Sequence, residues 1–369
     1  MVLKRVLRWS AGAIALALVA AFLLAYWTSG NTCGRPSPAH GAVMKAIIYC
    51  DYGPPDVLKF AVVEKPTPTD DQVLVRVHAA SVNPLDWHYM RGTPYIVRLM
   101  VGLRQPDDVR MGVDYAGTVE AVGKNVTQFK PGDEVFGGRN GALAEYVSAR
   151  EDRAIILKPA GLTFEQAAAV PIAAITALQA LRDQGKVQPG QKVLINGASG
   201  GVGTFAVQIA KSYGAEVTAV TSAKNADMVG SIGADHVIDY TREDYIKGGQ
   251  LYDLIFDCVG NRPLLENRRV LKPKGIYIGI GGGGPGQGGL IGPLIGPIKM
   301  SLLSPFVSQK FSWFEAELNK KDLSVLSDLM QAGKVTPVID RRYKLSETAD
   351  AIRYLETGHA RGKVVVTVE

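Results

Sequence analysis

The feature that most constrains this chain is a glycine-rich turn between an apolar run and an amphipathic segment. The run KVLIN at 192–196 leads into GASGGVG at 197–203. Apolar residues then recur with helical spacing until Gly214, at Val202, Phe205, Ala206, Ile209, Ala210 and Tyr213. Glycines let the backbone turn tightly and let a diphosphate approach, and a helix N-terminus offers free N–H groups. The pattern predicts a dinucleotide-binding turn made by Gly197, Ala198, Ser199, Gly200, Gly201, Val202 and Gly203.

The end of the next predicted strand, 216–220, distinguishes between the two nicotinamide dinucleotides. NAD-binding units commonly place a carboxylate there to hold the ribose hydroxyls. This chain has TSAKN at 221–225, which contains no acid, while Ser222 and Lys224 could bind and neutralise a 2′-phosphate. We therefore predict NADPH as the cofactor, with Tyr240 as a candidate to flank the adenine ribose. A solvated lysine at 224 and a plain strand-end tyrosine at 240 are the alternatives.

The order of predicted elements indicates an α/β chain with two parts. Short apolar strands, each followed by a helical stretch, predict a doubly wound parallel sheet; they lie at 192–196, 216–220, 236–240, 253–259 and 276–280. Turn-separated β patterns dominate from Met44 and return at 335–340 and 363–368, on either side of a helical piece. Residues 163–182 are predicted helical, with an interruption at Pro171. We expect a β-domain over 44–165, completed by 332–369, with the doubly wound domain inserted over 166–331.

The first 29 residues differ from the rest because a long stretch carries no charge. The apolar part, 9–27, has 19 residues, which as a helix spans roughly 28 Å, about the thickness of a bilayer core. We predict a single-pass N-terminal membrane helix within 1–29 and a linker over 30–43. A cleaved secretory signal and a true start at Met44 are the alternatives.

The charge pattern does not decide on which side of the membrane the body of the chain lies. Lys4, Arg5 and Arg8 precede the apolar stretch and favour export of the body, whereas NADPH is a cytoplasmic cofactor. An anchor with its N-terminus outside, or a start at Met44 and a cytoplasmic protein, would remove this conflict. A second apolar stretch, 290–311, is broken by three prolines and Lys299, so we predict a substrate or subunit lip there rather than a span.

Overall charge and the cysteines exclude some classes of protein. Lys plus Arg is 41 and Asp plus Glu is 35, giving +6, of which residues 1–43 hold +4. The body is left at +2, and no nucleic-acid partner is indicated. Cys33, Cys50 and Cys258 form no CxxC motif. We expect neither a structural zinc cluster nor a disulfide framework, and Cys50 is predicted to be a packing residue in a strand.

Several motifs make the chain similar to one known family. The pattern over 190–211, the opening MKAIIYCDYGPPDVLKF from Met44, SVNPLDW and GVDYAGTVEAVG carry the likeness. The sequence from Met44 to Glu369 resembles the zinc-independent quinone oxidoreductase (zeta-crystallin-like) branch of the medium-chain dehydrogenase/reductase superfamily. This resemblance implies a GroES-like β-domain plus a Rossmann domain, and it implies a homodimer.

The resemblance also implies the chemistry. Zinc-dependent relatives carry a ligand near Asn83 and a Gly-His-Glu motif that aligns with Gly112-Val113-Asp114, where the histidine is missing. Without a Lewis acid, hydride delivery to quinones or activated α,β-unsaturated carbonyls is much easier than alcohol oxidation. We expect an NADPH-dependent reductase of these acceptors with no metal. The alternatives are a 2-enoyl-thioester or other alkene reductase, a zinc-type alcohol dehydrogenase and a non-enzymatic NADPH-binding interaction protein.

The resemblance further implies which residues line the cleft. The catalytic candidates are Asn83, Asp86, His88 and Tyr89. The further cofactor-binding candidates are Thr176, Val259, Gly279 and Lys363. An Asx turn at Asn83, a loop-orienting role for Asp86, a helix hydroxyl bonded to its own backbone at Thr176 and a surface lysine at 363 are the structural alternatives.

Overall fold

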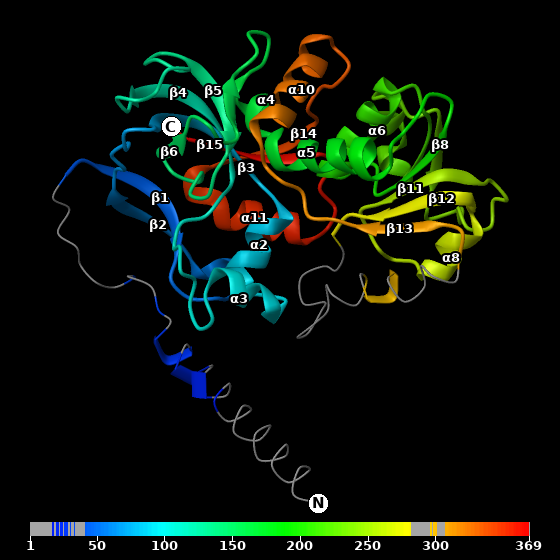
Figure 1. Ribbon diagram of the computed structural model, residues 1–369, viewed down its shortest axis with the longest axis horizontal. Helices are drawn as coiled ribbons and strands as arrows, with labels where there is room; N and C mark the ends of the chain where they lie inside the picture. The colour runs from blue at the N-terminus through cyan, green and yellow to red at the C-terminus, as the bar shows by residue number, and fades with distance from the viewer. Residues whose placement is uncertain are drawn as a thin grey trace, which may run out of the picture.

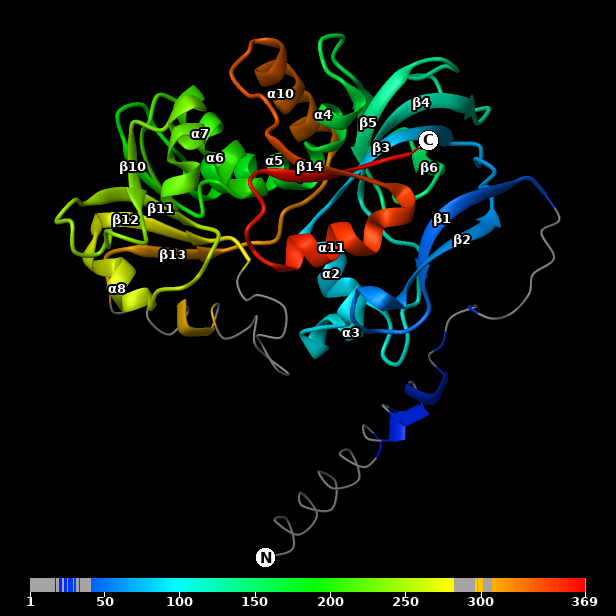
Figure 2. The same ribbon diagram turned by 180° about the vertical axis from the view of Figure 1, so that it is seen from behind.

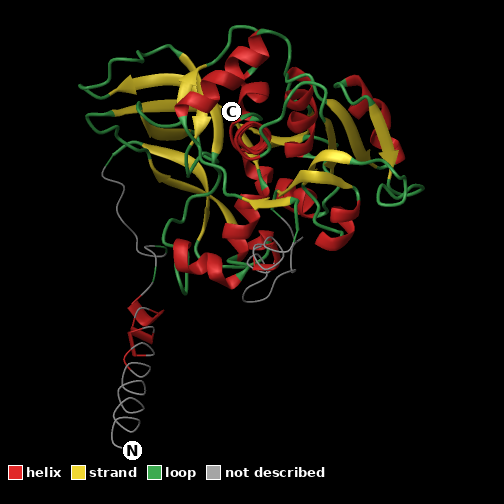
Figure 3. Ribbon diagram, turned by 45° about the vertical axis from the view of Figure 1, so that its right-hand side comes forward, coloured by secondary structure: helices red, strands yellow, loops and turns green. Residues whose placement is uncertain are grey.

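The computed structural model contains two large sheets and a two-stranded ribbon (Figure 1). It describes residues 41–281 and 307–368 together with residues 17, 20, 21, 23, 24, 26–28, 30, 33, 296 and 298–300. Helices lie between the two large sheets and over their faces (Figure 3).

The first large sheet is parallel and has six strands in the order β10-β9-β8-β11-β12-β13. Its strands are β8 (Lys192–Asn196), β9 (Glu216–Thr221), β10 (His236–Asp239), β11 (Tyr252–Asp257), β12 (Leu271–Gly279) and β13 (Lys310–Trp313). Its helices are α6 (Gly201–Ser212), α7 (Ala226–Ser231) and α8 (Leu264–Arg269). All pairings are parallel, so the carboxyl ends of the strands meet along one edge.

The second large sheet runs in the order β14-β15-β3-β4-β5-β7, with β6 pairing to β3. Its strands are β3 (Gln72–Val82), β4 (Asp114–Val122), β5 (Glu134–Gly138), β6 (Tyr146–Arg150), β7 (Ile155–Leu157), β14 (Ile339–Lys344) and β15 (Lys363–Thr367). The separate ribbon pairs β1 (Val43–Tyr49) with β2 (Leu58–Glu64). The remaining helices beside this sheet are α2 (Pro84–Arg91), η2 (Tyr95–Val97), α3 (Arg98–Val101) and α11 (Thr348–Glu356). Because β14 and β15 follow the parallel sheet in the chain, the prediction of an inserted doubly wound sheet is confirmed.

Two short helices join the sheets through one continuous core. They are α4 (Phe164–Ala168) and α5 (Pro171–Gln179); α5 continues into the π-helical turn Ala180–Gln184, and α10 (Lys320–Gln331) packs beside it. The core cluster around α5 includes Ala79 and Phe136 of the antiparallel sheet as well as Val193 and Phe205 of the parallel unit. The small side chains of α5 let both sides approach closely, so the two sheets share apolar packing rather than a wet boundary.

Two local expectations were incomplete. The edge strand β13 follows a stretch without clear alternation and was not predicted from the sequence. The β pattern over 335–340 is not a strand along its whole length, since β14 begins at Ile339. Both segments lie at sheet edges, where pairing depends on a neighbouring strand more than on local pattern.

The N-terminal prediction lies mainly outside the described residues. None of the helices in the described part of the chain has the length and apolar content that crossing a bilayer requires. Most of the predicted membrane helix over 1–29 and of the linker over 30–43 is not described, and the same holds for the predicted lip over 290–311.

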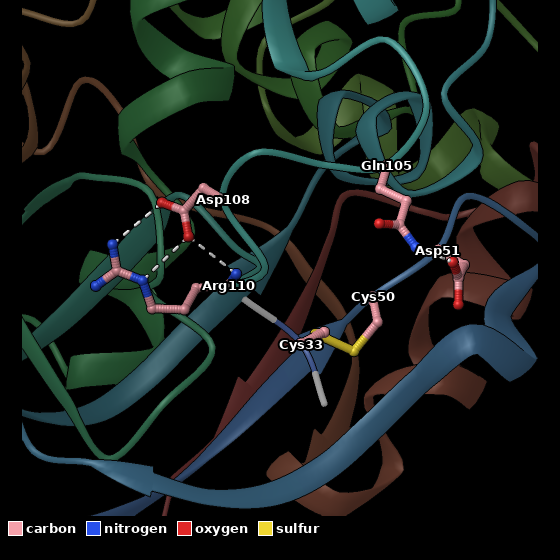
Figure 4. Close-up of a disulfide and its surroundings, with 6 residues drawn as sticks. All are labelled: Cys33, Cys50, Asp51, Gln105, Asp108 and Arg110. Atoms are coloured by element: carbon pink, nitrogen blue, oxygen red, sulfur yellow. Dashed lines mark hydrogen bonds and ion pairs between the residues drawn. A yellow bond between two sulfur atoms is a disulfide. The ribbon is translucent and has the colours of Figure 1, made fainter. Parts of the chain in front are cut away.

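The expectation about the cysteines was wrong. Cys33 and Cys50 form a disulfide, with their Cα atoms 5.6 Å apart (Figure 4). Cys50 therefore does not act only as a packing residue at the end of β1. Two cysteines 17 residues apart without a motif carry no pairing signal in sequence, because pairing depends on where the fold places them.

The glycine turn makes one substitution especially informative. A Cβ at Gly203 would collide with the Gly197 carbonyl oxygen and lie 2.8 Å from Ala198 Cα. We expect Gly203→Ala to lower the free energy of unfolding by about 3 kcal/mol or more, because backbone has to move. Gly230→Ala is the matched control, since nothing lies within 4 Å of a Cβ there, and a change of less than about 1 kcal/mol is expected. Urea denaturation measures both, and equal midpoints for the two variants would contradict the close approach.

Candidate functional site

The glycine turn connects β8 to α6 at the carboxyl edge of the parallel sheet. Gly197 has a φ of +83°, and Gly200 is the N-cap of α6. The Ser199 hydroxyl oxygen accepts hydrogen bonds from Thr221 Oγ1 at 2.8 Å and Asn225 Nδ2 at 3.1 Å. With its oxygen held by two donors, this hydroxyl keeps its own hydrogen for a ligand. The free N–H groups of α6 and this hydroxyl together suit an anionic diphosphate.

The other sequence-predicted cofactor residues lie along the same edge. Ser222 and Lys224 follow β9, with Lys224 exposed; Tyr240 follows β10 and is exposed; Val259 follows β11, and the buried Gly279 ends β12. The turn at Val259 is held by Asp257, whose Oδ1 accepts from the N–H groups of Val259 and Gly260, both at 2.9 Å. The parallel topology thus brings together the residues that the sequence placed at successive strand ends.

Thr176 lies apart from this edge, within α5. Its hydroxyl donates to the Ile172 carbonyl oxygen at 2.7 Å, which is the structural alternative weighed from the sequence. The hydroxyl oxygen retains its capacity to accept a hydrogen bond.

A fully buried carboxylate, Asp114, lies at the start of β4 in the second large sheet. Its Oδ1 accepts from the Ile172 N–H of α5 at 3.0 Å. Its Oδ2 accepts from Ser81 Oγ at 3.0 Å and Asn83 Nδ2 at 2.9 Å, and lies 3.5 Å from Lys363 Nζ. One side chain therefore links β3, β15 and the first turn of α5.

Lys363 joins this cluster to the cofactor turn. Its ammonium group donates to Asn83 Oδ1 and to the Val82 carbonyl oxygen, and its side chain is 3 % exposed. A Cβ at Gly201 would lie 3.2 Å from Lys363 Cδ, and the preceding Gly362 N–H donates to the Ser199 carbonyl oxygen at 2.8 Å. Burial lowers the pKa of Lys363, and the charges of Asp114 and Asp86 oppose that shift. The surface-lysine alternative at 363 was wrong.

Asn83 and Asp86 form the start of α2. Asn83 is buried. Its side-chain Oδ1 accepts from Lys363 and its Nδ2 donates to Asp114, while its backbone N–H donates to Asp86 Oδ2 at 2.7 Å. Burial raises the pKa of Asp86 to about 7, against the opposing effect of the Asn83 N–H. The carboxyl group of Asp86 is thus poised near neutrality, while the Asn83 side chain serves as a link within the cluster.

His88 and Tyr89 lie on α2 but do not join this cluster through a hydrogen bond. His88 Nδ1 lies 2.8 Å from the Thr93 carbonyl oxygen, and its ring stacks on Trp87. A carbonyl only accepts, so Nδ1 carries the proton and Nε2 of the neutral ring is an acceptor. Burial lowers the pKa of His88, which favours this neutral form. Burial and nearby Glu315 and Asp86 raise the pKa of Tyr89, so its phenol keeps its proton.

The side chains of this cluster are not the set of ligands that zinc uses. Zinc sites use thiolate, imidazole and carboxylate ligands, whereas Asp114 is accompanied by an amide, a hydroxyl and an ammonium group. The Lys363 ammonium would repel a divalent cation at this place. Within the described ranges, no three His, Cys, Asp or Glu side chains lie close enough together to hold a metal ion.

Sequence reasoning missed three residues of this site. Asp114 was considered only as a position where a zinc motif is absent, and Gly362 and Asn225 were not considered. A charged residue inside the otherwise apolar run MGVDYAG is the signal that could have identified Asp114, since buried carboxylates need partners.

Comparisons with known proteins agree with this geometry. Residues 69–160 match the alcohol dehydrogenase GroES-like domain, and residues 232–366 match the zinc-binding dehydrogenase family. A mitochondrial NAD(P)H oxidoreductase of Mus musculus is 34 % identical over 367 residues, covering 89 % of this chain and 90 % of the relative. The chain belongs to the medium-chain dehydrogenase/reductase superfamily.

Two further members of this superfamily are similar over most of their length. An NADPH-dependent alkenal/one oxidoreductase of Arabidopsis thaliana chloroplasts is 35 % identical over 342 residues, covering 88 % of this chain and 79 % of the relative. The solved quinone oxidoreductase of Coxiella burnetii is 32 % identical, with a TM-score of 0.77, covering 89 % of this chain and 100 % of that chain. The GroES-like plus Rossmann architecture expected from the sequence is thereby confirmed.

The buried ion pair generates a stability prediction. In Lys363→Met the Asp114 carboxylate stays buried without a cation, and we expect a loss of about 3 kcal/mol in the free energy of unfolding. Lys124→Met is the control, because Lys124 pairs with Asp70 at a side chain that is 73 % exposed; we expect less than about 1 kcal/mol there. Urea denaturation gives both values. Similar losses in the two variants would mean that the cluster contributes no more than a surface pair.

Asp86 generates a pH prediction. Because its pKa rises on folding, the native state binds the proton more tightly, and stability falls as pH rises from about 4 to about 7. Asp86→Asn keeps an oxygen for the Asn83 N–H and removes this titration. As pH rises through that window, we expect the free energy of unfolding of the variant to increase relative to that of the natural protein by about 1 kcal/mol per pH unit. Above the window the difference should stay constant. Parallel stability curves across the window would show that Asp86 does not titrate there.

Proposed function

We propose that this protein is an NADPH-dependent oxidoreductase that delivers hydride to quinones or activated α,β-unsaturated carbonyls without a metal. The supporting observation is the Lys363 cluster, which lies against the predicted dinucleotide turn and whose side chains do not suit zinc. The similarity to NAD(P)H-dependent oxidoreductases and to a quinone oxidoreductase points the same way.

The reaction assigns separate tasks to cofactor and protein. The reduced nicotinamide supplies the hydride when bound. The N–H groups at the start of α6 and the Ser199 hydroxyl hold the diphosphate, and Ser222 and Lys224 hold the 2′-phosphate. Electron-poor acceptors spread the added charge onto oxygen, so no Lewis acid is required.

The acceptor also needs a proton. The neutral His88 ring exposes only an accepting nitrogen, so it is a poor donor in this form. We favour water or the Tyr89 phenol, whose proton is retained near neutral pH. Asn83 and Asp86 act as positioning residues that fix the start of α2 beside Lys363.

Other expectations remain proposals. We retain the membrane helix over 9–27 because this uncharged apolar stretch matches a bilayer core, and we retain the homodimer on the resemblance alone. We also propose domain boundaries at 165/166 and 331/332. An alkene reductase acting on 2-enoyl thioesters is the second candidate activity, and a non-enzymatic NADPH-binding protein is the third.

Steady-state kinetics with 9,10-phenanthrenequinone, an enone and a 2-enoyl thioester test this function. We expect NADPH oxidation with the quinone or the enone, preferred over NADH and unchanged by a chelator. In Lys224→Ala we expect the KM for NADPH to rise about tenfold, the effect of losing one charge-assisted contact, while the KM for NADH changes less than about twofold.

Lys247→Ala is the matched control, since Lys247 is exposed and follows no strand end of the site. It should leave both KM values unchanged. Tight NADPH binding without turnover of any acceptor would favour the interaction protein. Activity that a chelator abolishes and zinc restores would contradict the metal-free reaction.

A further inference from the structure

A short apolar helical segment that follows α2 exposes its large side chains in the described structure. The segment Tyr95–Val101, formed by η2 and α3, contains no buried residue. Leu99 is 66 % exposed, Met100 71 % and Tyr95 51 %. We call these three side chains the ledge. Single exposed apolar residues are ordinary, but three large ones on seven consecutive residues form a patch that marks an interaction surface.

The ledge is held in place rather than loose. The Arg98 guanidinium donates to the Gly92 carbonyl oxygen at 2.9 Å and lies over the rings of Tyr52 and Tyr95. Tyr52 in turn donates to the Gly102 carbonyl oxygen at 2.6 Å. These contacts tie both ends of α3 to the body, so Leu99 and Met100 stay exposed on a fixed support.

The apolar N-terminal segment joins the body next to the ledge. The Cys33–Cys50 disulfide attaches that segment at the end of β1, and Gln105, just after α3, donates to the neighbouring Asp51 at 2.8 Å (Figure 4). A Cβ at Gly30 would lie 3.6 Å from Gln105 Oε1. The described N-terminal helical residues and α3 lie on the same side of the molecule in both views (Figures 1 and 2).

The N-terminal residues described near this attachment are themselves exposed. Leu24 is 66 % exposed and Trp27 71 %. Since the ledge and these residues are uncovered together, they do not cover each other. The two sets of exposed apolar residues lie on one side of the molecule, so a single apolar surface outside the protein suits both.

The charge of the segment suits an anionic surface. Residues 95–110 contain Arg98, Arg104 and Arg110 against Asp107 and Asp108, which leaves a small positive charge of +1. Basic residues beside exposed Leu, Met and Tyr are typical of helices that lie in a lipid headgroup region.

We propose that the ledge is a membrane-surface contact: Tyr95, Leu99 and Met100 enter the headgroup region of an anionic bilayer together with the exposed Leu24 and Trp27. This inference rests on the N-terminal membrane helix proposed above, and it does not depend on the proposed reaction. If both hold, the ledge brings α2 and its candidate residues near lipid, where hydrophobic acceptors dissolve, because α3 follows α2 in the chain.

The test must report on the ledge itself, since the N-terminal segment alone would bring the chain to vesicles. We would introduce Met100→Trp into the full chain and measure tryptophan quenching by phosphatidylcholine–phosphatidylserine vesicles with brominated acyl chains. The fluorescence of the natural chain, with its 4 tryptophans, is subtracted. Leu157→Trp is the matched control, because Leu157 is 54 % exposed on β7.

We expect the vesicles to quench roughly half of the fluorescence that Met100→Trp adds and almost none of that added by Leu157→Trp. Replacing phosphatidylserine by phosphatidylcholine should weaken the effect. Equal quenching at the two positions would overturn the membrane contact. It would also be overturned if light scattering showed that the chain self-associates and the introduced indole were thereby protected from the quencher. NADPH oxidation by the Met100→Trp variant, measured with a water-soluble quinone, keeps failure of the activity separate from failure of the contact.

Discussion

One buried carboxylate joins the elements around the candidate site of this protein. Asp114 accepts hydrogen bonds from a β3 hydroxyl, the Asn83 amide and the first turn of α5, and its charge is balanced by Lys363. Removing one of these partners leaves the buried Asp114 carboxylate incompletely paired. This costs free energy, because no water replaces the lost partner. The relative positions of β3, β15 and α5 therefore follow from satisfying a single side chain.

The same cluster connects the predicted cofactor turn to the start of α2. Gly362 and Lys363 contact the backbone at Ser199 and Gly201, so the turn and the start of α2 share one structural link. The arrangement stands where zinc-dependent relatives are expected to hold a metal. An ammonium–carboxylate pair supplies fixed charge and rigidity there, but no Lewis acid, which is consistent with a cofactor that carries the chemistry.

Much of the fold could be predicted because its signals are local. Alternating strands and helices, the glycine spacing and the missing acid after β9 each depend on a few consecutive residues. The same reasoning failed at β13, at the start of β14 and at the Cys33–Cys50 disulfide. Each of these depends on a partner far away in sequence, and no periodicity records that partner.

By itself, the sequence determined the parallel sheet, the turn at residues 197–203 and the row of candidate residues at successive strand ends. These features follow from hydrophobic period and from the backbone freedom of glycine. Only the tertiary structure decided that Asp114 is the centre of a buried hydrogen-bonded cluster, that Lys363 is buried and that α3 presents Leu99 and Met100 to the outside. Those outcomes depend on which groups lose their contact with water, and that is settled only when distant segments meet.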